Sequence, residues 1–109
     1  MKLKIGNKHI TIKEAITFYD RLTGLMGKKN INYGILFKNC NSIHTFFMQE
    51  EIDVVALNQN NEIIFKVVAL PKNKVFKVSK PQKNTTILEL PKNSSITLNV
   101  GQKIKFENW

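Results

Sequence analysis

Polar and apolar residues alternate along much of the chain, and a period of two is the pattern of β-strands with one buried face. The segments Lys2–Ile5 and Lys8–Ile12 alternate in this way on either side of a glycine and an asparagine, which predicts a hairpin with a tight turn. The segments Ile52–Leu57 and Glu62–Leu70 flank a polar run, Asn58–Asn61, and predict a second hairpin. Both hairpins favour a sheet whose strands are mainly antiparallel.

Further short runs are rich in apolar and β-branched residues and are predicted as strands. They are Ile35–Lys38, Ile43–Met48, Val75–Val78, Ile87–Leu90 and Lys103–Phe106. In the second of these, His44, Phe46 and Met48 would share one face, while Thr45 and Phe47 would share the other. Because both faces carry apolar groups, the run is typical of a central strand covered on both sides. An exposed aromatic patch for a partner is the alternative.

A short helix is predicted between the first hairpin and these strands. Thr17 is a suitable N-cap, Asp20 follows it three residues later, and Gly24 ends the segment, as in many helices of globular proteins. A second helical turn is predicted within Pro91–Asn99. Antiparallel strands with one or two short helices give an α+β fold, and we expect residues 1–109 to form a single domain. The many short strands favour a curved or partly closed, barrel-like sheet, because closure hides strand edges.

The composition is that of a globular protein. Hydrophobic residues make up 42% of the 109 residues, and no apolar run approaches the roughly 18 residues that a membrane helix needs. No signal-peptide pattern stands near Met1, and Cys40 is the only cysteine, so the chain suits the reducing cytoplasm. We expect a cytoplasmic monomer or weak dimer that binds no membrane.

The positive charge of the chain does not indicate a specific nucleic-acid partner. The formal charge is +9, and every basic residue except Arg21 is a lysine, whereas readers of nucleic-acid sequence rely on arginine. Lys66 to Lys83 contains several lysines and no acid, which is typical of a solvated basic face. A nucleic-acid footprint is the alternative, but Phe76 is the only aromatic residue in this stretch. We therefore expect only weak, non-specific nucleic-acid binding, lost as salt rises.

Several short motifs together resemble one family, domain of unknown function 192. They are Arg21-Leu22-Thr23-Gly24-Leu25-Met26, Gly34-Ile35-Leu36-Phe37, Ile43-His44-Thr45-Phe46-Phe47-Met48 followed by Ile52-Asp53-Val54-Val55, Leu88-Glu89-Leu90-Pro91, and Gly101-Gln102-Lys103-Ile104. Their order and spacing hold over most of the chain. The resemblance implies a compact β-rich domain with a small helix, and it implies no substrate, cofactor or catalytic residue.

Asp53 is the first candidate for a functional or structural role, because it interrupts an apolar strand. A carboxylate facing a core costs several kcal/mol unless hydrogen bonds or a cation offset its charge. The favoured interpretation is an anchor that accepts backbone N–H groups near Gly24 or Gln49. A general base or ligand carboxylate in a pocket is the alternative.

Two further charged residues are candidates. Arg21 is the only guanidinium in a lysine-rich chain, and its use indicates a need for two parallel hydrogen bonds. An internal pair with Asp53, Asp20 or Glu89 is favoured, and a clamp for an anionic ligand is the alternative. Glu89 stands between two leucines, and an edge-strand or N-cap role is favoured for it.

Soft side chains form the last candidate group. Cys40 and His44 are four residues apart, and Met26 and Met48 belong to neighbouring motifs. A thiolate–imidazole couple could act as a nucleophile, and such ligands could hold Cu(I). The spacing matches no recognised metal site, so a loop thiol and a half-buried histidine are favoured, and we expect no metal and no cofactor.

These observations favour a non-enzymatic accessory module that binds a small ligand or a protein where the Arg21–Met26 loop meets His44–Asp53. The alternatives are a small enzyme that uses Asp53 with His44 or Cys40, and a basic protein that associates weakly with nucleic acid. No phosphate-binding glycine loop, dinucleotide motif or nucleophile elbow stands in the sequence, which lowers the expectation of an enzyme.

Overall fold

The computed structural model describes residues 1–78 and 83–107, and its central feature is a seven-stranded sheet. The strands follow the order β6-β5-β8-β3-β2-β1-β9, and β4 pairs with β7 in a separate two-stranded sheet. Their bounds are β1 Lys2–Ile5, β2 Lys8–Glu14, β3 Tyr33–Phe37, β4 Ser42–His44, β5 Ile52–Leu57, β6 Ile63–Leu70, β7 Val75–Lys77, β8 Thr86–Pro91 and β9 Phe106–Glu107. The single helix of the described residues is α1, Phe18–Thr23. The fold is β-rich and of the α+β type, as expected, although its helix content is small.

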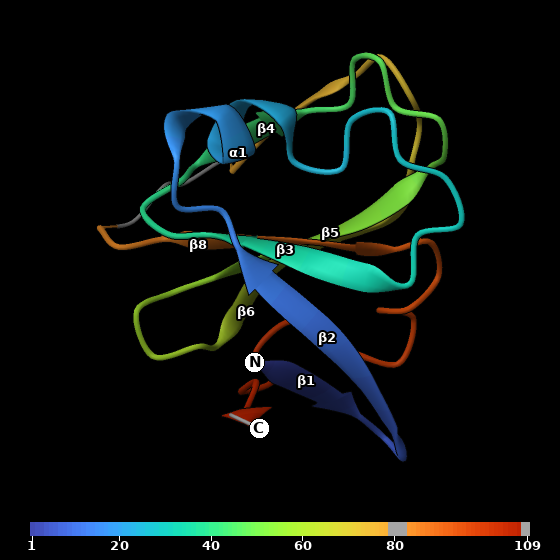
Figure 1. The fold of residues 1–109 in the computed structure, drawn as a ribbon. Helices are drawn as coiled ribbons and strands as arrows, with labels where there is room; N and C mark the ends of the chain where they lie inside the picture. The colour runs from blue at the N-terminus through green and yellow to red at the C-terminus, as the bar shows by residue number, and fades with distance from the viewer. Residues whose placement is uncertain (79–82, 108–109) are drawn as a thin grey trace.

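Both predicted hairpins form. Strand β1 pairs antiparallel with β2, and β5 pairs antiparallel with β6. The other pairings join strands that are distant in sequence, since β8 lies between β3 and β5 and is antiparallel to both. Strands β2 and β3 are parallel, and the connection between them contains α1. The helix therefore lies at one face of the sheet, above β3 and β8 in Figure 1.

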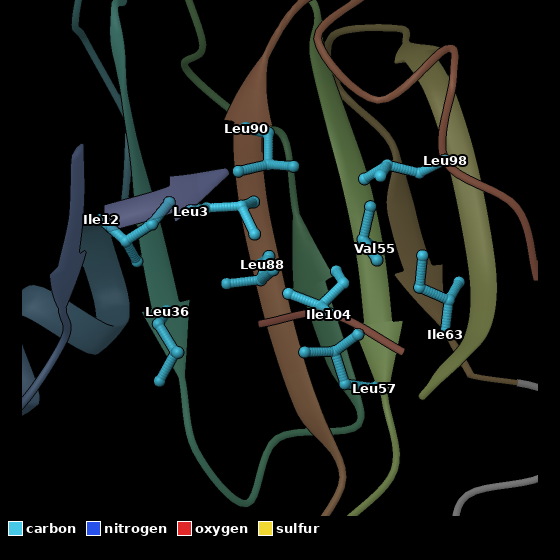
Figure 2. Close-up of a cluster of buried hydrophobic side chains, with 10 residues drawn as sticks. All are labelled: Leu3, Ile12, Leu36, Val55, Leu57, Ile63, Leu88, Leu90, Leu98 and Ile104. Atoms are coloured by element: carbon cyan, nitrogen blue, oxygen red, sulfur yellow. The ribbon is translucent and has the colours of Figure 1, made fainter. Parts of the chain in front are cut away.

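The sheet separates two hydrophobic clusters. The first contains Leu3, Ile12, Leu36, Val55, Leu57, Ile63, Leu88, Leu90, Leu98 and Ile104. Figure 2 shows these side chains extending from neighbouring strands, with Leu98 and Ile104 supplied by the segment that follows β8. The second cluster includes Leu25, Phe37, Val54, Phe76 and Ile87. Because side chains alternate along a strand, Leu88 and Leu90 face the first cluster, and Ile87 and Glu89 face the second.

Helix α1 begins and ends as its sequence predicts. The Thr17 hydroxyl accepts a hydrogen bond from the Asp20 backbone N–H at 3.0 Å, which satisfies one of the unpaired donors of the first turn. Gly24 is the C-cap with φ +48° and ψ −122°, and its N–H donates to the Asp20 carbonyl. Glycine adopts this backbone conformation without steric cost, so the chain can turn sharply toward Leu25, which is fully buried.

The structure corrects several expectations. The sheet is open, with β6 and β9 at its edges, so the barrel-like form was wrong. The Pro91–Asn99 segment forms a strand end and successive turns instead of a helix. The last strand lies at Phe106–Glu107 instead of Lys103–Phe106.

The predicted strand Ile43–Met48 ends at His44, and within the part of the chain that the structure describes it pairs only with β7. Thr45 leaves the strand because its hydroxyl donates to the Pro71 carbonyl at 2.7 Å and accepts from the Lys74 N–H at 2.8 Å. Phe47 has φ +62°, a conformation that cannot continue a strand. The covered central strand was therefore wrong.

Candidate functional site

A small pocket lies between α1 and the segment that leads into β4. Its volume is about 120 Å³. Residues on the α1 side are Arg21, Leu22, Thr23 and Gly24, and the other lining residues are Phe37, Cys40, Ser42, Ile43, His44 and Glu89. The structure thus gathers four of the candidate site residues, together with Cys40, from three regions of the chain.

Glu89 is the buried carboxyl of this pocket. Its relative exposure is 3%, and its position in β8 directs it toward the face of the sheet that α1 covers. Within the described residues it accepts one hydrogen bond, from the Leu25 N–H to Oε1 at 3.2 Å. Burial raises the pKa of Glu89 to about 7, and the hydrogen bond from Leu25 opposes this rise. The carboxyl can therefore either donate or accept a hydrogen bond near neutral pH. An edge-strand or N-cap role was wrong, because β8 is an inner strand.

Gly24 permits the close approach between the helix end and Glu89. A Cβ atom at this position would lie 2.6 Å from Glu89 Oε1 and 3.1 Å from the Phe37 ring. Both distances are shorter than ordinary van der Waals contact. The absence of a side chain at Gly24 therefore keeps the floor of the pocket accessible. Phe37 adds an apolar wall, and the sequence carries no signal for this role because an apolar residue in a strand is ordinary core.

Arg21 extends from the last turn of α1 to line the same pocket. It is exposed, and among the described residues it forms no ion pair with any carboxylate. The internal pair with Asp53, Asp20 or Glu89 was therefore wrong. The Arg21 guanidinium lines the pocket without a carboxylate partner among the described residues.

Cys40 and His44 both line the pocket but do not bond to each other. The Cys40 thiol donates to the Ser42 carbonyl at 3.1 Å, and His44 Nδ1 accepts from the Phe46 N–H at 3.3 Å. A neutral imidazole that accepts at Nδ1 carries its proton on Nε2. His44 is therefore arranged as a hydrogen-bond donor, and the thiolate–imidazole couple is not formed in this arrangement.

Asp53 lies on the opposite face of the sheet, where Val55 and Leu90 contribute to the first cluster. It is completely buried. Oδ1 accepts from the Ala69 and Asn93 N–H groups, and Oδ2 accepts from the Ser95 N–H, each at 2.8 Å. The Ser95 hydroxyl donates to Oδ2 at 2.5 Å. Asp53 is thus an acceptor of backbone N–H groups, but the expected donors near Gly24 and Gln49 were wrong.

The two candidate methionines lie outside the pocket. Met48 is buried in the second cluster and Met26 is half-buried. No three His, Cys, Asp or Glu side chains among residues 1–78 and 83–107 are grouped so that they could hold a metal ion. The pocket therefore combines one guanidinium, one imidazole, one thiol and one buried carboxyl without a metal-ligand set.

The comparisons with known proteins identify the family. The family DUF192, described as an uncharacterized ACR, matches residues 1–106. The chain belongs to the DUF192 family. Two curated relatives are UPF0127 proteins: one from Thermococcus sibiricus is 39% identical over 59 residues, and one from Thermococcus kodakarensis is 37% identical over 62 residues. These matches cover 49% and 51% of this chain and only 38% and 40% of the relatives.

Two solved structures have the DUF192 fold of this chain despite low sequence identity. A protein of unknown function from Novosphingobium aromaticivorans superposes with a TM-score of 0.78 at 11% identity, over 96% of this chain and 82% of its own. A protein from Sinorhizobium meliloti, proposed as a transcription regulator, gives a TM-score of 0.79 at 14% identity, over 95% and 89%. Among the described residues, no helix is long and apolar enough to cross a membrane.

Proposed function

We propose that this DUF192 chain is a non-enzymatic accessory module that binds a small ligand in the pocket beneath α1. The observation that carries the proposal is Glu89, a buried carboxyl that lines an accessible pocket and receives one hydrogen bond within the described residues. A buried carboxyl whose hydrogen-bonding capacity is not fully used lowers the stability of the fold. The presence of such a group beside a pocket therefore favours a role in binding. We place the module in the cytoplasm, where Cys40 stays reduced.

The lining of the pocket specifies the chemistry of the ligand. Arg21 supplies the forked donor group that matches a carboxylate, and Glu89 supplies an acceptor for an amine or hydroxyl. The volume of about 120 Å³ is below the roughly 300–1,000 Å³ of pockets that enclose drug-sized ligands. A ligand of a few heavy atoms with both groups, such as a small amino acid or hydroxy acid, fits these requirements.

The ligand chemistry can be tested with four simple probes. Glycine and glycolate carry both a carboxylate and a donor, whereas acetate lacks the donor and ethylamine lacks the carboxylate. In ¹H–¹⁵N NMR titrations we expect glycine or glycolate to give saturable shifts at the Gly24 and Leu25 amides, and acetate and ethylamine to bind at least about tenfold more weakly, since a lost charged hydrogen bond costs about 1.5–3 kcal/mol.

Matched variants make this test specific. Glu89→Gln and Arg21→Gln should each weaken the binding of glycine or glycolate. Glu51→Gln is the control, because Glu51 pairs with Lys92 at 2.9 Å and does not line the pocket. Saturable shifts that persist unchanged in Glu89→Gln, or no saturable shift with any probe, would contradict the proposal.

A second candidate function is acid–base catalysis in the same pocket. It is favoured by the Glu89 pKa of about 7, since a general acid or base works best with a pKa near the working pH. Glu89 takes the place of Asp53 in this hypothesis, because Asp53 faces away from His44 and Cys40. Hydrolysis of p-nitrophenyl acetate that is lost in both Glu89→Gln and Cys40→Ser would favour this candidate over simple binding.

A further inference from the structure

Three segments that are distant in sequence meet at one end of the molecule. The Thr45 N–H donates to the Lys74 carbonyl at 2.8 Å, and the Asn73 N–H donates to the Thr45 carbonyl at 3.0 Å. The Gly27 N–H donates to the Phe47 carbonyl at 3.1 Å. In Figure 1 the loop after β4, in green, and the loop before β7, in gold, lie side by side at the upper right. The turn at residues 45–48 is therefore fixed on two sides.

This turn presents two phenylalanines to solvent. Phe47 is 74% exposed and Phe46 is 41% exposed. Phe47 has φ +62°, which is uncommon for a bulky residue and persists only where the surroundings enforce it. The Phe46 ring stacks on His44 at 5.2 Å between centroids. The turn thus exposes both rings, and one face of the Phe46 ring is covered by His44.

Four lysines belong to the segments that bond to this turn or pair with β4. Lys28, Lys72, Lys74 and Lys77 are exposed, and none of them forms an ion pair with another described residue. Two acids stand beside one of these lysines, since Glu50 and Glu51 line a pocket with Lys72. Glu51 pairs with Lys92, and Glu50 accepts from the Ile31 N–H, a hydrogen bond that does not neutralise a carboxylate. We call this turn and these lysines the aromatic–lysine surface: Lys28, Phe46, Phe47, Lys72, Lys74 and Lys77.

The fold brings exposed aromatic side chains next to the lysine-rich segment, which has none of its own. Phe76, its only aromatic residue, is 5% exposed and packs in the second cluster, so it cannot stack on a partner. Phe46 and Phe47 come from a different part of the chain and are brought to the same surface by the bonds of Thr45. Aromatic faces beside a row of cations are the two parts of a single-strand binding platform.

We propose that the aromatic–lysine surface binds single-stranded nucleic acid, with bases stacked on Phe46 and Phe47 and phosphates neutralised by the surrounding lysines. The surface contains no arginine and offers no fixed set of base-edge donors, so binding is weak and without sequence preference. A flat partner suits Phe46 better than a lipid phase does, because its ring lies against His44 instead of projecting. This proposal does not depend on a ligand in the pocket beneath α1.

Fluorescence anisotropy with labelled twelve-nucleotide oligo(dT), oligo(dA) and a duplex of the two tests this assignment. We expect both single strands to bind more tightly than the duplex, because stacking requires unpaired bases. With about three or four phosphates neutralised, the plot of log affinity against log salt should have a slope of about −2 to −3. Equal or tighter binding of the duplex would overturn the proposal.

Point variants separate stacking from general charge attraction. Phe47→Ala should weaken single-strand binding about fivefold or more, the lower end of what loss of one stacked base costs. Lys74→Gln should make the salt slope shallower by about 0.7. The controls are Val100→Ala and Lys4→Gln, which change exposed residues outside the surface, and both should bind like the parent.

Two outcomes would overturn the proposal in favour of another partner. If Phe47→Ala binds oligonucleotides like the parent while Lys74→Gln and Lys4→Gln weaken binding equally, the attraction is only that of net charge. If binding to phosphatidylserine–phosphatidylcholine vesicles depends on Phe47 while oligonucleotide binding does not, the surface is a membrane contact. Circular dichroism of each variant verifies that the fold is retained.

Discussion

Asp53 and Glu89 are both buried carboxyls next to apolar residues, yet their surroundings give them different properties. Three backbone N–H groups and one hydroxyl donate to Asp53, and such donors stabilise a carboxylate. Glu89 receives one hydrogen bond within the described residues and lines a pocket. Asp53 therefore holds the loop after β8 in place, whereas Glu89 has hydrogen-bonding capacity that is not used within the described residues.

The Glu89 pKa predicts how stability depends on pH. Burial raises the pKa of Glu89 from its ordinary value of 4.5 to about 7, so the folded state binds more protons than the unfolded state between these pH values. Glu89 therefore adds about 3 kcal/mol to the free energy of unfolding below pH 4.5, relative to its contribution at high pH. This addition is lost as the pH rises from 4.5 through 7. Glu89→Gln should remove this loss, because glutamine does not titrate.

Urea unfolding of the parent and Glu89→Gln at pH values from about 5 to 8 measures this effect. The difference in unfolding free energy between the two proteins should change with pH in favour of the variant, while pH effects of other groups cancel. A difference that stays constant over this range would show that Glu89 has an ordinary pKa.

Asp53→Asn should destabilise the fold by about 3 kcal/mol or more. The amide presents two hydrogens where the carboxylate accepts from Asn93, Ser95 and Ala69, so at least one buried donor loses its partner. Cys40→Ser is the matched comparison, because a serine hydroxyl can also donate to the Ser42 carbonyl, and it should change stability by less than about 1 kcal/mol. Equal melting temperatures for Asp53→Asn and the parent would show that Asp53 is not an anchor.

At the scale of elements, the junction between α1 and β8 depends on a glycine. Gly24→Ala places a methyl group 2.6 Å from Glu89 Oε1 at a backbone conformation with positive φ. Gly6→Ala provides the control, because Gly6 has φ +59° and no atom within 4 Å of the added Cβ. The control should lose about 1 kcal/mol from backbone strain alone, and Gly24→Ala should lose about 2 kcal/mol more from overpacking.

Thermal melts of both glycine variants provide the comparison. The binding of glycine or glycolate adds a second readout, since the methyl group at position 24 enters the floor of the pocket and Gly6 lies elsewhere. If the two variants melt at the same temperature, the end of α1 can shift away from Glu89. The short distance between position 24 and the Glu89 carboxyl would then not explain why this position needs a glycine.

Elements with local signals could be predicted from the sequence, and those fixed by distant contacts could not. Strands β1 and β2 alternate cleanly around a turn, and α1 has its own cap at Thr17, so both are encoded nearby. The run Ile43–Met48 has the composition of a strand, but the Thr45 hydroxyl bonds to Pro71 and Lys74, far along the chain. Tertiary contacts of this kind override local propensity.

The residues of the candidate site could likewise be recognised in the sequence one by one, but their grouping depends on contacts between distant strands. Arg21, Gly24, His44 and Glu89 were recognised as individual candidates, and the structure places them around one pocket. Asp53 was grouped with them, although it faces the other side of the sheet. The error follows from register: Val54 pairs with Glu89 and Asp53 pairs with Leu90, so the two acids point to opposite faces, and only the pairing of β5 with β8 reveals this.

At the scale of the whole molecule, the sheet carries a hydrophobic core on each of its two faces. Cluster residues on both faces are almost completely buried, and burial of apolar surface is the main favourable term in folding. The loop after β8 is held by charge from two sides, since Asp53 accepts its N–H groups and Lys66 Nζ donates to the Ser95, Ile96 and Leu98 carbonyls. Side chains of this chain thus perform the fixation that a bound cation provides in some small domains.

Chelation therefore should not unfold the protein. No metal-binding group of His, Cys, Asp and Glu exists among the described residues, and the remaining positions, 79–82 and 108–109, contain none of these residue types. Since a structural metal contributes about 10 kcal/mol or more to small domains that depend on one, its loss would be obvious. We expect the melting temperature to be unchanged, within about 1 °C, after dialysis against excess EDTA and after addition of Zn²⁺. A fall in melting temperature with EDTA that Zn²⁺ reverses would require ligands contributed by a second molecule, because one copy of the chain does not supply a set.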